Sequence, residues 1–153
     1  EACREFGLVG MPYGVLAGGV LTGKYHDSKF AGDRSLAAAR MNSQPQFQPR
    51  YNNAYAMQAA GEYLKLASKY NMTPLDMALI FARDRRYNAA VIIGTTTVKQ
   101  VEDCVAAFTK PPLPDDLLVE IDKIHEKFRN PQAAYASKDL VNSPDFWDAT
   151  CSS

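Results

Sequence analysis

The sequence predicts an α/β fold, in which strands of a parallel sheet alternate with amphipathic helices. Residues 90–93 form a continuous apolar run rich in β-branched residues, as is typical of a strand buried on both faces of a sheet. Residues 8–12 form a second strand-like stretch. Apolar residues at helical spacing follow each of these stretches, which indicates helices packed on the sheet.

The helix after residues 90–93 has a recognisable start. Gly94 ends the strand, and three threonines follow it. Thr97 and Gln100 have the spacing of a capping box, in which each side chain bonds the other residue's backbone N–H. The apolar stripe predicted to be buried on this helix consists of Val98, Val101, Val105 and Phe108.

This junction has the chemistry of an anion site. Free backbone N–H groups and the positive end of the helix dipole point at one spot, and Lys99 adds a positive charge in the first turn. A phosphate is the natural ligand of such a site. The alternative is purely structural, because turns and caps need glycine and threonine for their own geometry.

Three further helices are predicted. One covers residues 55–70 and ends at Asn71 as a left-handed cap, and the next begins with Thr73 as N-cap and Pro74 in the first position. The last begins at Asp115 and carries an apolar stripe that ends at Phe128. Residues 1–6 are predicted to be the end of a helix that stops at Gly7, as if the chain entered a larger domain part-way through.

A second glycine-bearing segment, residues 8–25, reads Leu-Val-Gly-Met-Pro-Tyr-Gly-Val-Leu-Ala-Gly-Gly-Val-Leu-Thr-Gly-Lys-Tyr. Together with residues 90–108, it resembles the C-terminal half of the aldo-keto reductase superfamily. In that family the seventh barrel strand commonly ends in Tyr-Ser-Pro-Leu-Ala-Gly-Gly-Leu-Leu-Thr-Gly-Lys-Tyr. The eighth commonly ends in Ile-Pro-Gly, a hydroxyl-rich turn and Gln-Leu-Glu-Glu-Asn. Residues 117–131 are similar to the closing helix and its Arg-Asn-Pro end.

The resemblance implies the C-terminal part of a TIM (β/α)8 barrel, incomplete in this chain. Such barrels need roughly 250 residues, and this chain has 153. Residues 1–131 would form the barrel portion, and residues 132–153 a tail in which Phe146 and Trp147 are a docking anchor or simply packing. The family's catalytic Asp, Tyr, Lys and His lie on the first half, so no catalytic residue is expected here.

The implied function is the NADP-binding half of an oxidoreductase that reduces carbonyls to alcohols. Arg34 is the candidate phosphate-binding residue of the long polar loop 26–53, which also carries Arg40 and Arg50. The residues expected to bind the cofactor are Leu16, Ala17, Gly18, Lys24, Arg34, Gly94, Thr96, Lys99, Gln100 and Asp103.

Several positions depart from the family's pattern. Gly14 and Val15 replace Ser-Pro, Ile93 replaces Pro, and Cys104 replaces an Asn that contacts the adenine. Each departure removes a fixed conformation or a polar contact. The alternative is therefore a chain that has lost its cofactor and serves as a non-catalytic structural or interaction subunit.

The composition excludes some partners. Lys+Arg and Asp+Glu both number 17, and this neutrality argues against a nucleic-acid surface. No apolar run approaches the ~20 residues of a membrane span. Three widely spaced cysteines indicate neither a metal site nor a disulfide framework, which suggests the cytoplasm or another reducing compartment. His26 and His125 are expected on the surface.

The barrel portion cannot cover its own strands. Two buried-type strands from an eight-stranded barrel leave open sheet edges and bare apolar faces. The partner that covers them is expected to be the missing barrel half, a second copy of the chain, or a larger assembly.

Overall fold

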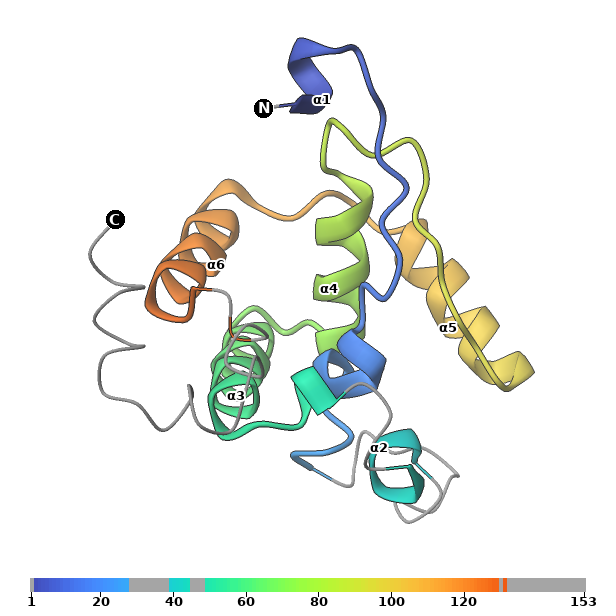
Figure 1. Ribbon diagram of the computed structural model, residues 1–153, viewed down its shortest axis with the longest axis vertical. Helices are drawn as coiled ribbons and strands as arrows, with labels where there is room; N and C mark the ends of the chain where they lie inside the picture. Colours follow the sequence, from blue (N-terminus) through green and yellow to red (C-terminus); the bar gives the residue numbers. More distant parts are fainter. Residues whose placement is uncertain (1, 28–38, 45–48, 130, 132–153) are drawn as a thin grey trace.

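The computed structural model describes residues 2–27, 39–44, 49–129 and 131. Arg34 and the Phe146–Trp147 pair lie outside these ranges. Helices make up most of the described chain (Figure 1). In chain order the elements are α1 (Ala2–Glu5), η1 (Ala17–Thr22), α2 (Arg40–Ser43), η4 (Pro49–Tyr51), α3 (Ala54–Lys69), α4 (Pro74–Arg83), α5 (Val98–Phe108) and α6 (Asp115–Lys127).

The two predicted strands run side by side and parallel, but they form isolated bridges rather than a continuous ladder. Gly10 pairs with Asn88, and Tyr13 pairs with Ile92. The Gly10 N–H donates to the Tyr87 carbonyl (2.6 Å), and the Ile92 N–H donates to the Pro12 carbonyl (2.9 Å). The second segment has one more residue between the bridges than the first, so the register slips by one and the ladder is interrupted.

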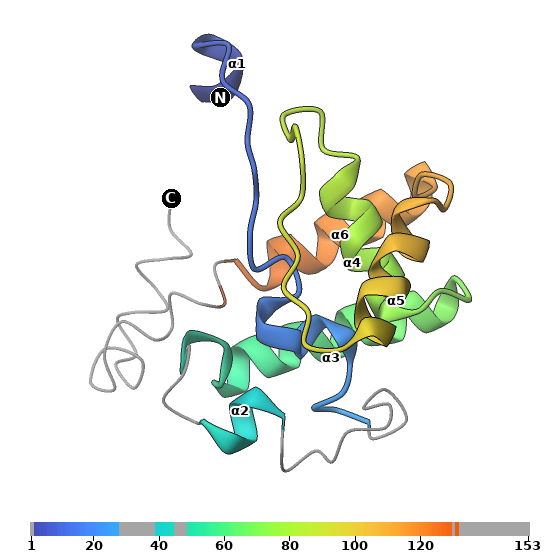
Figure 2. The same ribbon diagram turned by 90° about the vertical axis from the view of Figure 1, so that its right-hand side faces the viewer.

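The described chain does not bury these strands on both faces, as expected of a barrel portion that cannot cover its own strands. Val9, Met11 and Ile92 are 70%, 59% and 47% exposed. Helices α4 and α5 cover one side of the pair, and no helix of the described residues covers its opposite side (Figure 2). A pair of strands covered on one side cannot bury residues that point to the other side.

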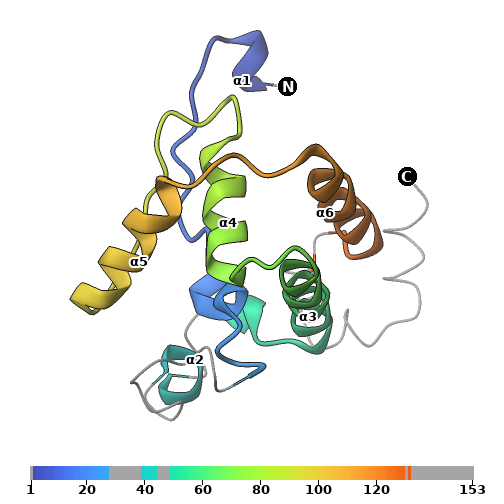
Figure 3. The same cartoon turned by 180° about the vertical axis from the view of Figure 1, so that it is seen from behind.

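The predicted helices on either side of residue 71 are confirmed to within one residue. Asn71 has a φ of 53°, as a left-handed cap requires. The Thr73 side chain accepts a hydrogen bond from the Asp76 N–H, with Pro74 in the first helical position. The last helix, α6, is also confirmed, with Leu117 and Ile121 buried. It packs on α3 and, together with α4, encloses the main core (Figure 3).

Helix α5 turns a different face inward from the one predicted. Val98, Val101 and Val105 are 75%, 42% and 54% exposed, whereas Cys104 and Ala107 are buried. The reason is that α5 packs on α4, where these two small residues meet Leu79. Phe108 is partly buried against the same cluster.

The start of the chain agrees with the prediction. Helix α1 ends just before Gly7, which has a φ of 60°, and the Leu8 N–H bonds back to the Cys3 carbonyl. In the described ranges, no helix combines the length and the apolar character that crossing a membrane demands.

Candidate functional site

The first part of the candidate site is the tight turn η1, which follows the first extended segment. Ala17, Gly18 and Gly19 have φ values of 50°, 64° and 94°, so three consecutive residues are left-handed. Leu16 closes the turn, because its carbonyl accepts from the N–H groups of Gly19 (2.8 Å) and Leu21 (3.2 Å). For Ala17 the left-handed conformation is strained, and such strain is found preferentially at functional sites.

Lys24 belongs to the same turn. A Cβ built on Gly19 would lie only 2.6 Å from the Lys24 Cε, so the lysine stem lies directly against the Gly19 backbone. The Lys24 Nζ lies 5.1 Å from the centroid of the Tyr25 ring. The structure therefore brings Lys24 to the turn that contains Ala17 and Gly18, as predicted.

The second part of the site is the N-terminus of α5. The Thr97 hydroxyl accepts from the Gln100 N–H (3.2 Å), which confirms Thr97 as the N-cap. The second bond of the predicted capping box, from the Thr97 N–H to the Gln100 side chain, is not the one that forms. The Gln100 Oε1 accepts instead from the N–H (2.9 Å) and the hydroxyl (3.2 Å) of Thr96, so Gln100 holds the loop in front of the helix.

The charge of Lys99 is not isolated. Its Nζ forms an ion pair with the Asp103 carboxylate one helical turn further along α5. Both side chains are substantially exposed, so the pair is screened by solvent. A phosphate at this helix end would be attracted by the positive end of the helix dipole and by Lys99, which also pairs with Asp103.

Gly94 has open space beside it. A Cβ at this position would meet nothing within 4 Å, and its φ lies outside the left-handed region. The described chain therefore gives no steric reason for a glycine here. The bare backbone at Gly94 leaves room for another molecule to approach closely.

The two parts of the site lie at the same end of the parallel pair (Figure 2). Tyr13 bridges to Ile92, and residues that follow them, Leu16 in the first segment and Ile93 in the second, pack against one cluster formed by Leu79, Cys104 and Ala107. Both glycine-bearing turns therefore begin at the carboxyl ends of two neighbouring parallel segments. Ligands of open and closed parallel sheets bind at this end.

Arg50 is the residue that sequence reasoning did not select. The Tyr51 hydroxyl lies 3.9 Å from the position of a Cβ on Gly14, which places η4 against the first segment. The Arg50 Cζ lies over the Tyr51 ring, 4.9 Å from its centroid, and the side chains of Tyr51 and, to a smaller extent, Tyr13 raise the pKa of Arg50. The Arg50 Nε is buried and has no hydrogen-bond partner among the described residues. Nothing in the sequence distinguished Arg50 from the other arginines of the loop.

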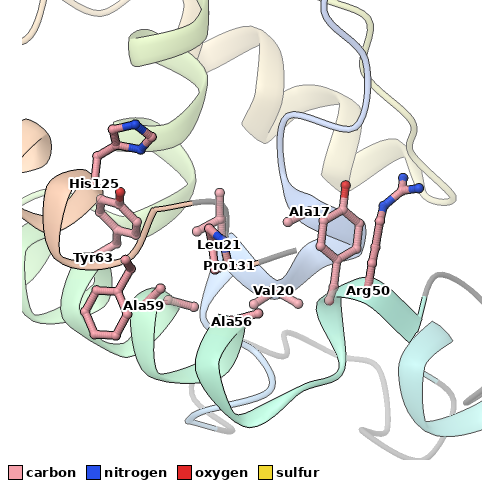
Figure 4. Close-up of a pocket in the computed structure, with 12 residues that line it drawn as sticks. Ala17, Val20, Leu21, Arg50, Ala56, Ala59, Tyr63, His125 and Pro131 are labelled. Atoms are coloured by element: carbon pink, nitrogen blue, oxygen red, sulfur yellow. The ribbon is translucent and has the colours of Figure 1, made fainter. Parts of the chain in front are cut away.

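A cavity of about 600 Å³ adjoins this region (Figure 4). Ala17 and Arg50 lie at one end, and Tyr63 and His125 lie at the other. The walls between them are mainly apolar side chains of η1 and α3. Burial, and secondarily the Asp122 carboxylate, raise the pKa of Tyr63.

The remaining candidates for chemistry are on the surface. His26 and His125 are exposed, as predicted, and the His26 Nε2 lies 2.9 Å from the Met57 carbonyl oxygen. Within the part of the chain that the structure describes, no group of three or more His, Cys, Asp or Glu side chains could hold a metal ion.

Comparison with known proteins identifies the family. Residues 1–126 match the model of the Aldo/keto reductase family. The chain is 29% identical over 132 residues to Protein tas of Escherichia coli (strain K12), a match that covers 86% of this chain and 36% of that protein. It is 28% identical over 135 residues to an aldo-keto reductase of Babesia bovis, which covers 86% and 46% of the two chains. The chain thus spans between a third and a half of the length of these curated relatives. Because the family match extends over most of its residues, the chain belongs to the aldo/keto reductase family, whose fold is the TIM barrel.

Proposed function

We propose that this chain is the NADP(H)-binding, C-terminal part of an aldo/keto reductase barrel, and that the rest of the barrel supplies the residues that reduce the carbonyl. The observation that carries the proposal is that both glycine-bearing turns leave the same end of a parallel pair, with Arg50 beside the first of them. In TIM-barrel enzymes the active site lies at that end of the strands.

The C-terminal placement rests on the two glycine-bearing motifs of residues 8–25 and 90–108. The order of the elements fits consecutive units of a βα barrel, because two parallel segments are joined by helices α3 and α4, and α5 and α6 follow the second segment.

The residues present fit a dinucleotide. Among the described residues, Arg50 has a buried donor without a partner, and Gly94 has open space beside it. We assign the pyrophosphate to the backbone of Leu16, Ala17 and Gly18 together with Lys24 and Arg50. The adenosine part of the cofactor is assigned to Gly94, Thr96, Lys99, Gln100 and Asp103, with Lys99 on its phosphate. Arg34 remains a candidate outside the described residues. When bound, the reduced cofactor supplies a hydride.

The preference for NADP(H) over NAD(H) rests on Lys99 and the threonine turn. An added phosphate gains a charge-assisted bond to Lys99, but it must compete with Asp103 for that lysine. We expect Lys99→Glu to reverse the preference, because it replaces a positive charge with a negative one beside the phosphate.

A second candidate function is that of a non-catalytic interaction subunit. It is favoured by the exposure of Val9, Met11 and Ile92 and of the valine stripe on α5. These surfaces suit docking to the missing barrel half, to a second copy, or to a larger assembly.

Nucleotide titration separates the two functions. The unaltered chain should quench or shift NADPH fluorescence on binding, with weaker binding of NADH. Arg50→Met should weaken NADPH binding at least about tenfold, as expected for the loss of a charge-assisted phosphate contact. Arg86→Met, an exposed arginine beside Tyr87, is the control and should bind normally. Undetectable binding of both nucleotides would favour the interaction subunit.

The chain alone should not reduce aldehydes or ketones, because the catalytic groups are assigned to the rest of the barrel. Steady-state NADPH oxidation by the purified chain tests this. Substrate-dependent oxidation that a point substitution in this chain abolishes would contradict the assignment.

A further inference from the structure

The side chain of Asn53 makes more contacts than a helix cap requires. Its Oδ1 accepts from the Ala56 N–H (2.8 Å) and caps α3. Its Nδ2 donates to the Arg50 carbonyl (2.8 Å) and to the Pro131 carbonyl (3.3 Å). The orientation of the amide is determined by these partners, since a backbone N–H faces the oxygen and backbone carbonyls face the nitrogen.

Capping by itself does not need an amide. Serine, threonine and aspartate cap helices about as well, because each offers an acceptor oxygen. Of the common N-cap side chains, only asparagine also offers two N–H donors that point the other way. The two donor bonds of Asn53 are therefore additional to its role in starting α3.

The donor bonds hold a short element. Helix η4 is only three residues long, and Arg50 lies at its centre. So short a helix has few backbone bonds of its own, and its orientation depends on contacts from outside. The Asn53 bond to the Arg50 carbonyl is such a contact, and it ties the arginine backbone to the rigid start of α3.

The same amide reaches the chain that leaves α6, through the carbonyl of Pro131. A second bond joins the same two regions, from the Tyr55 hydroxyl to the Lys127 carbonyl (3.0 Å). Asn53 thus lies where η4, the start of α3 and the end of α6 meet. Figure 4 shows Arg50 and Pro131 from two of these three elements.

We propose that Asn53 is a positioning residue, which holds η4 so that the Arg50 guanidinium faces the nucleotide phosphates. Its bond to the Pro131 carbonyl links η4 to the chain after α6. The inference rests on the proposed function, because it assumes that Arg50 meets a phosphate. It adds a residue that touches no ligand and acts through another side chain.

Substitutions that keep the cap isolate the donor bonds. Asn53→Ser retains a capping oxygen but is too short to reach both carbonyls, and Asn53→Asp retains the oxygens but has no donor. Both should leave the helix content unchanged by circular dichroism. Each should weaken NADPH binding about fivefold, as one lost hydrogen bond predicts. The same two substitutions at the exposed neighbour Asn52 serve as controls and should leave NADPH binding normal. Asn52→Ser controls for the change in chain entropy, and Asn52→Asp controls for the added charge.

A double-mutant cycle tests whether Asn53 acts through Arg50. In an Arg50→Met background, Asn53→Ser should cause no further loss of affinity, since the group that it positions is gone. If Arg50→Met weakens NADPH binding and Asn53→Ser does not, the positioning role is overturned and the proposed function stands. If Arg50→Met has no effect, or if the unaltered chain binds no NADPH, the assignment of Arg50 to the phosphate fails and this inference fails with it.

A measurement without nucleotide checks the geometry directly. The buried Arg50 Nε–H should exchange slowly with solvent in the unaltered chain and in Asn52→Ser, as followed by nitrogen-resolved NMR. Asn53→Ser should speed that exchange at least about fivefold. Equal exchange in all three proteins would show that Asn53 does not hold Arg50.

Discussion

At the scale of single residues, two glycines that look alike in the sequence have different roles. Gly19 has a φ of 94°, and a side chain there would collide with Lys24. Gly94 has an ordinary backbone conformation and open space around it. The first glycine is therefore required by the fold, whereas no contact among the described residues requires the second.

Alanine substitutions should separate these roles. Gly19→Ala should lower the free energy of unfolding by about 1–2 kcal/mol, because it adds left-handed strain and displaces Lys24. Gly94→Ala should leave that free energy within about 0.5 kcal/mol of the unaltered value but should weaken NADPH binding. Urea denaturation and nucleotide titration measure both effects. Equal destabilisation by the two changes would refute the distinction.

The thiol of Cys104 provides a pH-dependent prediction. Burial, and secondarily the Asp103 carboxylate, raise the pKa of Cys104. The folded state therefore favours the protonated thiol. The resulting stability is fully present below the thiol pKa of the unfolded chain, about 8.5, and is lost as the pH rises through the higher folded value.

The free energy of unfolding should be lower at pH 9.5 than at pH 7, and Cys104→Ala should make this difference smaller. In a Cys151→Ser background, a thiol reagent at pH 8 should modify the half-buried Cys3 first and Cys104 only on unfolding. Modification of both thiols at one rate in the folded protein would contradict the burial of Cys104.

At the scale of elements, helix α4 is anchored by a compact polar network at its start. The Thr73 hydroxyl donates to the Asp76 Oδ2 (2.6 Å), and the Lys110 Nζ donates to the same oxygen (2.6 Å). Asp76 is only 6% exposed. The network joins α4 to the chain after α5, so the two helices that flank the site keep their mutual orientation.

Two lysine–aspartate pairs among the described residues should differ in strength. Asp76→Ala should destabilise the protein by about 1–3 kcal/mol, because it leaves Thr73 and Lys110 without their partner in a partly buried place. Asp103→Ala breaks the exposed pair on α5 and should cost less than about 0.5 kcal/mol. Thermal denaturation of both variants gives the comparison. A larger loss for Asp103→Ala would reverse the expected order.

At the scale of the whole molecule, the described chain leaves much apolar surface uncovered. The exposed side chains gather on the extended segments near the N-terminus and on the outer face of α5. Burial of apolar surface is worth about 25 cal/mol per Å², so this surface favours association. We expect the isolated chain to pair through the extended segments, whichever of the three partners covers them in the full protein.

Sedimentation should therefore show concentration-dependent association at low micromolar concentration. Met11→Lys places a charge on the open side of the parallel pair and should weaken that association. Val119→Lys adds the same charge at an exposed valine of α6 and should have little effect. A monodisperse chain at all concentrations, or equal effects of the two lysines, would show that the extended segments are not the interface.

The sequence by itself determined the features that depend on local chemistry. The caps at Thr73 and Thr97, the left-handed Asn71 and the apolar stripe of α6 follow from side chains within one or two helical turns. The family also followed from the sequence, because its two glycine-bearing motifs are short and ordered. These interactions need no distant partner, so a local pattern suffices to predict them.

Only the tertiary structure decided what depends on distant neighbours. It turned Cys104 and Ala107 of α5 inward instead of the valine stripe, because small residues fit against α4. It also brought Arg50 to the first glycine-bearing turn through Tyr51, Tyr13 and Asn53. Periodicity shows that a helix has an apolar face, but which residues are buried is decided by the elements that pack on it, and those contacts join residues far apart in the chain.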